Sequence, residues 1–153
     1  MFYRTIATML LLAGKAYAVD PATDACSLLS PAAISKALGQ TYSAPEKTVA
    51  PRPFANTNQG TDCHYKSGSH ELLLRVYVDP TPAASTDLFV RLKQFFGGGS
   101  TVVSGLGDEA YLDKQQAIHV RKGKVRYFIQ QSQSTPTRVQ NVKTLSTQVA
   151  GEL

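Results

Sequence analysis

Apolar residues recur at helical spacing in three segments, and each segment opens with a hydroxyl residue followed by proline. These openings are Ser30-Pro31, Thr81-Pro82 and Thr135-Pro136. Each hydroxyl can accept an otherwise unpaired backbone N–H, and a proline at the first helical position loses no hydrogen bond. The sequence therefore predicts three helices, the first of which ends at Gly39. Their apolar stripes are formed by Ile34 and Leu38; by Leu88, Phe89, Leu92, Phe95 and Phe96; and by Val139, Val142, Leu145 and Val149.

Residues 63–79 alternate between apolar and polar side chains, which is typical of strands with one buried face. A two-residue turn at Gly68-Ser69 pairs Lys66 with Glu71 and predicts a β-hairpin with a favourable cross-strand charge pair. The buried face of this hairpin comprises Cys63, Tyr65, Leu72, Leu74, Val76 and Val78.

Residues 116–130 predict a second hairpin by the same alternation. A turn at Lys122-Gly123 would place Arg121 opposite Lys124. The buried face would then comprise Ile118, Val120, Val125, Tyr127 and Ile129.

The order of these elements predicts an α+β domain, in which an antiparallel sheet carries helices packed on one face. A hairpin followed by a helix occurs over residues 61–96 and again over residues 110–151, which suggests an internal duplication of a β-β-α unit. Residues 40–60 contain three prolines and many polar residues. We expect a long loop there, with one edge strand near Thr48.

The N-terminus has the pattern of a cleaved signal peptide over residues 1–18. An apolar run from Ile6 to Gly14 ends in Ala16-Tyr17-Ala18, the small-x-small pattern at which signal peptidase cuts. A buried N-terminal helix is the alternative, and the run is shorter than the roughly 20 residues that span a bilayer. We expect a single domain over residues 19–153, periplasmic or secreted, with no transmembrane segment after cleavage.

Two cysteines, Cys26 and Cys63, lie in the part of the chain that remains after cleavage. An even pair in an exported protein favours a disulfide, which would tie together the ends of the long loop. Lipid attachment at Cys26 is the alternative. Thr23 stands three positions upstream, where a lipidation signal has an apolar residue, so we prefer the disulfide.

The stretch GLGDEA (105–110) matches a variant of the dinucleotide-binding fingerprint. That fingerprint requires a helix directly after the glycines, because the helix N-terminus binds the pyrophosphate. Here a strand-like pattern follows, and the acidic side chains of Asp108 and Glu109 would stand where phosphates bind. We therefore expect no cofactor, and interpret Gly105, Gly107 and Asp108 as a structural turn.

Other chemical motifs are sparse in this chain. His64, His70 and His119 lack the spacing of metal ligands, and neither H-E-x-x-H nor G-x-S-x-G occurs. The sequence thus predicts no metal site and no catalytic residue, although a hydrolase with dispersed residues stays open as an alternative.

The formal net charge is +5, to which Arg4 and Lys15 of the leader contribute two. This mild excess does not by itself indicate a nucleic-acid partner. The second hairpin gathers a candidate anion-binding face, which we call the basic hairpin face: His119, Arg121, Lys124 and Arg126.

The basic hairpin face predicts a non-enzymatic binding domain for an anionic envelope component, such as a phosphorylated polymer, a lipid headgroup or an acidic protein. A solvated outer surface is the alternative interpretation of the same residues. A second function stays open, namely a protein–protein interaction module such as an inhibitor or immunity protein.

Several short motifs occur together along the chain: Asp24-Ala25-Cys26, Leu28-Leu29, a proline-led helix from Ser30 to Leu38, Cys63 near Tyr65, and GLGDEA. This combination resembles a group of small bacterial envelope proteins, which are secreted or lipid-anchored domains of unknown function, similar to extracytoplasmic sensor-type domains. The resemblance implies an α+β domain with a disulfide and without established catalytic residues. The chain departs from the lipid-anchored members because it lacks their lipidation signal.

Overall fold

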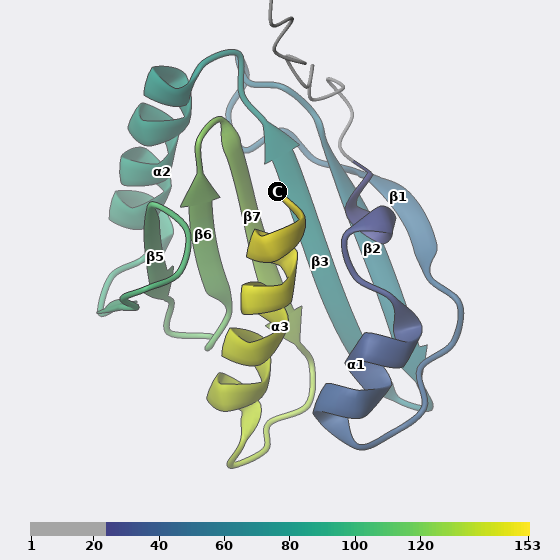
Figure 1. Cartoon of the computed structure of the whole chain (residues 1–153). Helices are drawn as coiled ribbons and strands as arrows, with labels where there is room; N and C mark the ends of the chain where they lie inside the picture. Colours follow the sequence, from purple (N-terminus) through teal and green to yellow (C-terminus); the bar gives the residue numbers. More distant parts are fainter. Residues whose placement is uncertain (1–23) are drawn as a thin grey trace, which may run out of the picture.

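The computed structural model describes residues 24–153, which form a seven-stranded antiparallel sheet with helices on both faces (Figure 1). The strand order across the sheet is β1-β2-β3-β7-β6-β5-β4. The strands are β1 (Glu46–Ala50), β2 (Gly60–Ser67), β3 (His70–Val78), β4 (Thr101–Val102), β5 (Glu109–Leu112), β6 (Ile118–Lys122) and β7 (Val125–Gln131). The predicted α+β class is confirmed, whereas the signal peptide predicted for residues 1–18 lies outside the described residues.

Two of the three predicted helix starts are confirmed by their capping bonds. The helices are the short 3-10 turn η1 (Ala25–Ser27), α1 (Pro31–Leu38), α2 (Pro82–Phe96) and α3 (Arg138–Glu152). The hydroxyls of Ser30 and Thr81 each accept a backbone N–H at 3.1 Å from the residue three positions on. The cap predicted at Thr135 is wrong, because its carbonyl accepts the N–H of Arg138 in a turn, so that the helix begins later.

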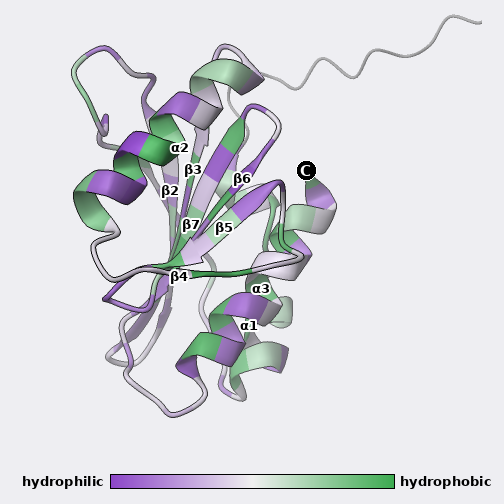
Figure 2. Ribbon diagram, turned by 90° about the vertical axis from the view of Figure 1, so that its left-hand side faces the viewer, coloured by the Kyte–Doolittle hydropathy of each residue, from purple (hydrophilic) through white to green (hydrophobic). Residues whose placement is uncertain are grey.

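The helices divide between the two faces of the sheet, as the edge-on view shows (Figure 2). The face that carries α1 and α3, which we call the first face, matches the predicted packing. In contrast, α2 lies on the opposite, second face, where Phe89 packs against Tyr111 with ring centroids 5.2 Å apart. The prediction of helices on one face differs from the structure in this respect, because the second face also offers aromatic side chains to a helix.

This division leaves the suggested duplication unconfirmed. The central strands β3 and β7 are antiparallel neighbours, so the two hairpins could be exchanged by a two-fold rotation perpendicular to the sheet. Such a rotation keeps each face in place and would put α2 and α3 on the same side. Because they lie on opposite sides, the two β-β-α units are not related in this way.

The first face holds the apolar core. Its sheet side chains include all six residues of the face predicted for the first hairpin, and α3 adds Val142, Leu145 and Val149. Tyr127 donates its hydroxyl to the Ser146 carbonyl at 2.9 Å, which fixes α3 on β7. The predicted disulfide is confirmed, with Cys26 and Cys63 joined across 37 residues of sequence.

The predicted turn is correct in the first hairpin and wrong in the second. The register of β2 and β3 is as predicted, with Lys66 opposite Glu71. In the β6–β7 hairpin the register predicted around Lys122-Gly123 is wrong, because Gly123 and Lys124 form the turn. Gly123 has φ 58°, a conformation that favours glycine at the first turn position. The partners therefore shift by two residues, which leaves each side chain on its predicted face.

The long loop contains an edge strand at the expected place. Strand β1 includes Thr48 and pairs with β2. The rest of the loop, residues 51–59, crosses the end of the second face. There Tyr77 donates its hydroxyl to the Pro51 carbonyl at 2.7 Å. Among residues 24–153, no helix has the length and apolar character needed to cross a membrane.

Candidate functional site

Two arginines of the basic hairpin face are held by carboxylates from other parts of the fold. Arg126 is 3% exposed and forms two hydrogen bonds with Asp79, at 2.5 and 2.9 Å. Arg121 contacts Asp108 at 2.8 Å and Glu109 at 3.3 Å. Arg121 and Arg126 stand opposite each other on β6 and β7, and carboxylates of the same chain neutralise their like charges. Neither guanidinium is available as a free anion site.

The other two residues of the basic hairpin face lie apart. Lys124 is in the turn, and its ammonium forms no ion pair within residues 24–153. His119 points into a cavity on the second face, where its Nε2 lies 2.9 Å from Oδ2 of Asp113. The structure thus separates the four residues and brings one of them to a candidate site.

The imidazole of His119 is fixed from several sides. Its ring stacks on Tyr111, with centroids 4.6 Å apart and planes 7° from parallel, and contacts Phe128 at 5.2 Å. The other carboxylate oxygen of Asp113 accepts the Ala117 N–H at 2.9 Å. Burial opposes ionisation of Asp113, but the hydrogen bonds from His119 and Ala117 outweigh it and lower its pKa. The pair is therefore a rigid wall of the cavity.

The cavity has a volume of about 500 Å³ and lies between α2, the sheet and two loops. This volume falls within the range of small-molecule sites, about 300–1,000 Å³. The cavity is lined by Pro51, Arg52, Pro53, Arg75, Tyr77, Leu92, Phe96, Asp113, Lys114, Gln115, Ala117, His119, Phe128 and Gln130. Among these described residues there is no serine, threonine or cysteine that could act as a nucleophile beside His119.

Three permanent cations line the cavity, and one of them, Arg75, is already paired with a carboxylate. Arg75 is held by two hydrogen bonds to Asp62, at 2.5 and 2.6 Å, and its guanidinium lies 5.1 Å from the centre of the Phe128 ring. Burial disfavours the charged guanidinium, but the hydrogen bond to Asp62 contributes to a raised pKa, so Arg75 stays charged. Arg52 and Lys114 are exposed at the rim and form no ion pair within the described part of the chain.

The remaining walls are apolar or aromatic. Leu92 and Phe96 come from α2, whereas Tyr77 and Phe128 come from the central strands. Burial raises the pKa of Tyr77, whose hydroxyl holds the Pro51 carbonyl and so positions the neighbouring Arg52 over the cavity. The arrangement can accept a small molecule that combines a negative charge with a flat or apolar part.

Sequence reasoning identified His119 but missed the cations of the cavity. The signal for Arg75 is its position as the one charged residue within the apolar run from Leu72 to Val78. Such a charge within a strand needs a partner or a ligand. Arg52 and Lys114 carry no such signal, because only the packing of their loops brings them to the same opening.

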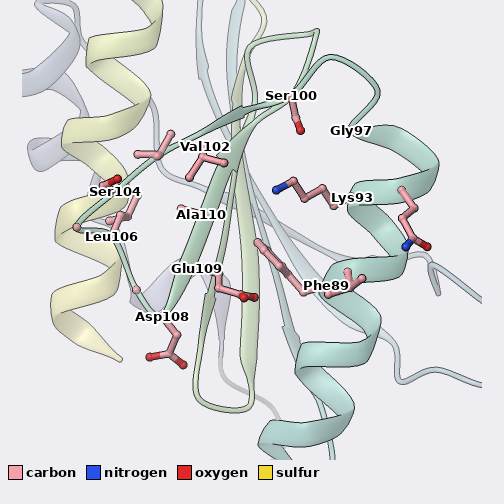
Figure 3. A pocket seen from close by; sticks show the side chains of 15 residues that line it. Phe89, Lys93, Gly97, Ser100, Val102, Ser104, Leu106, Asp108, Glu109 and Ala110 are labelled. Atoms are coloured by element: carbon pink, nitrogen blue, oxygen red, sulfur yellow. The ribbon is translucent and has the colours of Figure 1, made fainter.

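A second cavity, of about 700 Å³, lies on the other side of α2, against β4, β5 and the GLGDEA stretch (Figure 3). The turn has left-handed glycines at Gly105 and Gly107, and a Cβ at Gly107 would come within 2.5 Å of the Arg121 carbonyl oxygen. Asp108 accepts the Gly123 N–H at 2.7 Å, and strand β5 follows rather than a helix. The stretch therefore packs against the β6–β7 turn at Gly123 and presents no helix N-terminus to a phosphate.

His64 forms a different constellation on the open part of the second face. Its Nδ1 lies 2.6 Å from the Glu71 carboxylate, and its Nε2 lies 3.2 Å from the Thr48 hydroxyl. A hydroxyl, an imidazole and a carboxylate in this order can support nucleophilic catalysis. However, none of the three lines either cavity beside α2, so they lie apart from both candidate binding sites.

Within residues 24–153 no three His, Cys, Asp or Glu side chains gather in a way that could hold a metal ion. In comparisons with known proteins, no family model matches this chain, and no curated protein matches its sequence. The assignment of function therefore depends on the geometry of the site.

Proposed function

We propose that this chain is an exported, non-enzymatic binding domain that takes a small anionic ligand into the cavity between α2 and the second face. The observation that carries the proposal is the convergence of Arg52, Arg75 and Lys114 on a cavity with aromatic walls. Two of these cations, Arg52 and Lys114, have no carboxylate partner within residues 24–153. An anionic ligand would supply the missing countercharge, and the rings of Tyr77 and Phe128 would pack on its apolar part.

Two features support export to the periplasm or the cell exterior. The N-terminal pattern is that of a signal peptide, and the Cys26–Cys63 disulfide is a bond that persists in oxidising compartments. The proposal also agrees with the resemblance of the motifs to small envelope domains. The ligand would then be an envelope component with a carboxylate, sulfate or phosphate group.

The proposal is tested with two fluorescent probes of similar shape, anionic 1-anilinonaphthalene-8-sulfonate and neutral N-phenyl-1-naphthylamine. We expect the anionic probe to bind more tightly than the neutral one. The double variant Arg52→Gln and Lys114→Gln should weaken the anionic probe about fivefold for each charge removed, since each contributes about 1 kcal/mol near the surface, and leave the neutral probe unchanged.

Lys124→Gln is the matched control, because it removes a cation that lies outside the cavity. It should leave both probes unaffected. Equal binding of the anionic probe to all variants would contradict the proposal. Native mass spectrometry of the unreduced exported protein gives a second readout: a retained small anion supports it, whereas a stoichiometric protein partner favours the interaction-module alternative.

A further inference from the structure

Two exposed phenylalanines, Phe95 and Phe96, lie next to each other at the C-terminal end of α2, with ring centroids 6.4 Å apart. Within residues 24–153 the large hydrophobic residues that are exposed are Val49, Val90, Phe95, Phe96 and Val102. All except Val49 belong to the second half of α2 or to β4, which follows it directly. Phe95 and Phe96 are 73% and 63% exposed, although helical spacing predicts both within a buried stripe. An exposed aromatic pair such as Phe95 and Phe96 marks a candidate interaction site.

A basic residue accompanies the two phenylalanines. Arg91 lies over the Phe54 ring at 4.3 Å, and that ring contacts Phe95 at 5.9 Å. Val90, Lys93 and Val102 lie apart from the phenylalanine pair, because they line the cavity on the other side of α2, together with Glu109 (Figure 3). We call Phe95 and Phe96, together with Arg91, the aromatic–basic patch.

Acidic residues are missing from this part of the chain. The sequence contains no Asp or Glu between Asp87 and Asp108, and Arg91 forms no ion pair within the described residues. Lys114 adds a further cation, because its side chain lies against Gly98 and Gly99 at the end of α2. The patch is therefore both apolar and positively charged.

We propose that the aromatic–basic patch docks on the surface of an anionic lipid bilayer. Phenylalanines that protrude beside lysine and arginine suit the membrane interface, where the rings enter the headgroup region and the cations meet lipid phosphates. A two-fold contact with a second copy is disfavoured, since it would place Arg91 and Lys114 against the same cations. A protein partner fits less well, because lysine is depleted in the centres of protein interfaces.

The docking surface goes beyond the cavity ligand and does not depend on it. Phe95 lines neither cavity beside α2, so its role in docking can be separated from probe binding. Phe96 lines the cavity of the proposed function, and docking would therefore bring that cavity close to the bilayer.

The test is co-sedimentation of the exported chain with vesicles of phosphatidylcholine alone or of phosphatidylcholine mixed with phosphatidylglycerol. We expect binding to the anionic vesicles that weakens as salt is added. Phe95→Ser should reduce this binding about tenfold, because one phenylalanine ring no longer leaves water. Arg91→Gln should reduce it about fivefold on anionic vesicles and leave neutral vesicles unaffected.

Val49→Ser is the matched control, since Val49 is 68% exposed but lies on β1, outside the patch. All variants share one N-terminus, so any contribution from that segment is common to them. Unchanged vesicle binding in Phe95→Ser overturns the proposal, as does equal binding of the unaltered chain to neutral and anionic vesicles. A dimer in sedimentation velocity that Phe95→Ser converts to a monomer would instead identify the patch as a self-association surface.

Discussion

The two faces of the sheet are built on different principles, although the same strands supply both. The first face is apolar: residues such as Leu74, Val120 and Ile129 are fully buried beneath α1 and α3. The second face carries charges in its covered part, including Arg126 with Asp79. Burying an aliphatic or aromatic side chain contributes about 1.5–3 kcal/mol, whereas a buried ion pair contributes little net stability. The comparison indicates that the first face holds the fold, while the charges of the second face shape a cavity.

Breaking a buried ion pair on the second face should have the largest effect. Asp79→Asn would leave the Arg126 guanidinium buried without its countercharge, since the two side chains are only 1% and 3% exposed. We expect the free energy of unfolding in urea to fall by about 3–5 kcal/mol. Replacing both residues with apolar ones of similar volume, Asp79→Leu with Arg126→Met, should recover much of this loss.

The exposed pair of Glu46 with Lys66, also on the second face, serves as the control for this prediction. Glu46→Gln should leave the free energy of unfolding unchanged within error, because both side chains are solvated. A loss in Glu46→Gln comparable with that in Asp79→Asn would contradict the distinction between buried and solvated charges.

Neighbouring leucines on β3 allow a direct comparison of the faces. Leu74 is fully buried on the first face, whereas Leu73 points to the second face and is half-buried. Leu74→Ala should lower the free energy of unfolding by about 2–5 kcal/mol through lost burial and the cavity left behind. Leu73→Ala should lower it by clearly less, as measured in the same urea titration. Equal losses at the two positions would show that both faces contribute alike.

Two buried tyrosines sharpen the comparison at the level of a single hydroxyl. Tyr127 on the first face donates to the Ser146 carbonyl, whereas the hydroxyl of Tyr111 on the second face is buried with no partner within residues 24–153. Tyr127→Phe should lower the free energy of unfolding by about 0.5–1.5 kcal/mol. Tyr111→Phe should leave it unchanged or raise it, because an unsatisfied polar group is removed. Thermal unfolding of both variants decides this, and destabilisation of Tyr111→Phe by as much as Tyr127→Phe would reveal a partner for its hydroxyl.

The same contrast explains how far the sequence predicts this structure. The first face follows from alternation alone, and the register shift of the second hairpin moved no residue from it, because side chains repeat every two residues along a strand. The disulfide was likewise predictable from an even pair of cysteines.

The arrangement of side chains on the second face depends on contacts between segments that are distant in sequence. The local pattern of apolar and polar residues does not predict such contacts. Arg126 meets Asp79 across 47 residues of sequence, and Arg52 reaches the cavity only because Tyr77 holds the Pro51 carbonyl. The exposure of Phe95 and Phe96 was equally invisible, since their helical spacing is that of a buried stripe. Alternation shows which side a residue takes, but not which carboxylate or helix covers it.

The smallest expected effect on the free energy of unfolding is its pH dependence at Asp113, a carboxylate on the second face. The hydrogen bonds from His119 and Ala117 lower the pKa of Asp113 below its usual 3.8, despite the opposing effect of burial. An acid with a lowered folded-state pKa contributes stability above its unfolded pKa and loses it as the pH falls through the folded value. The difference in unfolding free energy between the unaltered chain and Asp113→Asn should therefore be constant above about pH 5 and shrink as the pH falls below about 4. Urea titrations across this range measure it, and a difference that does not change with pH would show that the carboxylate is not held in its ionised form by His119.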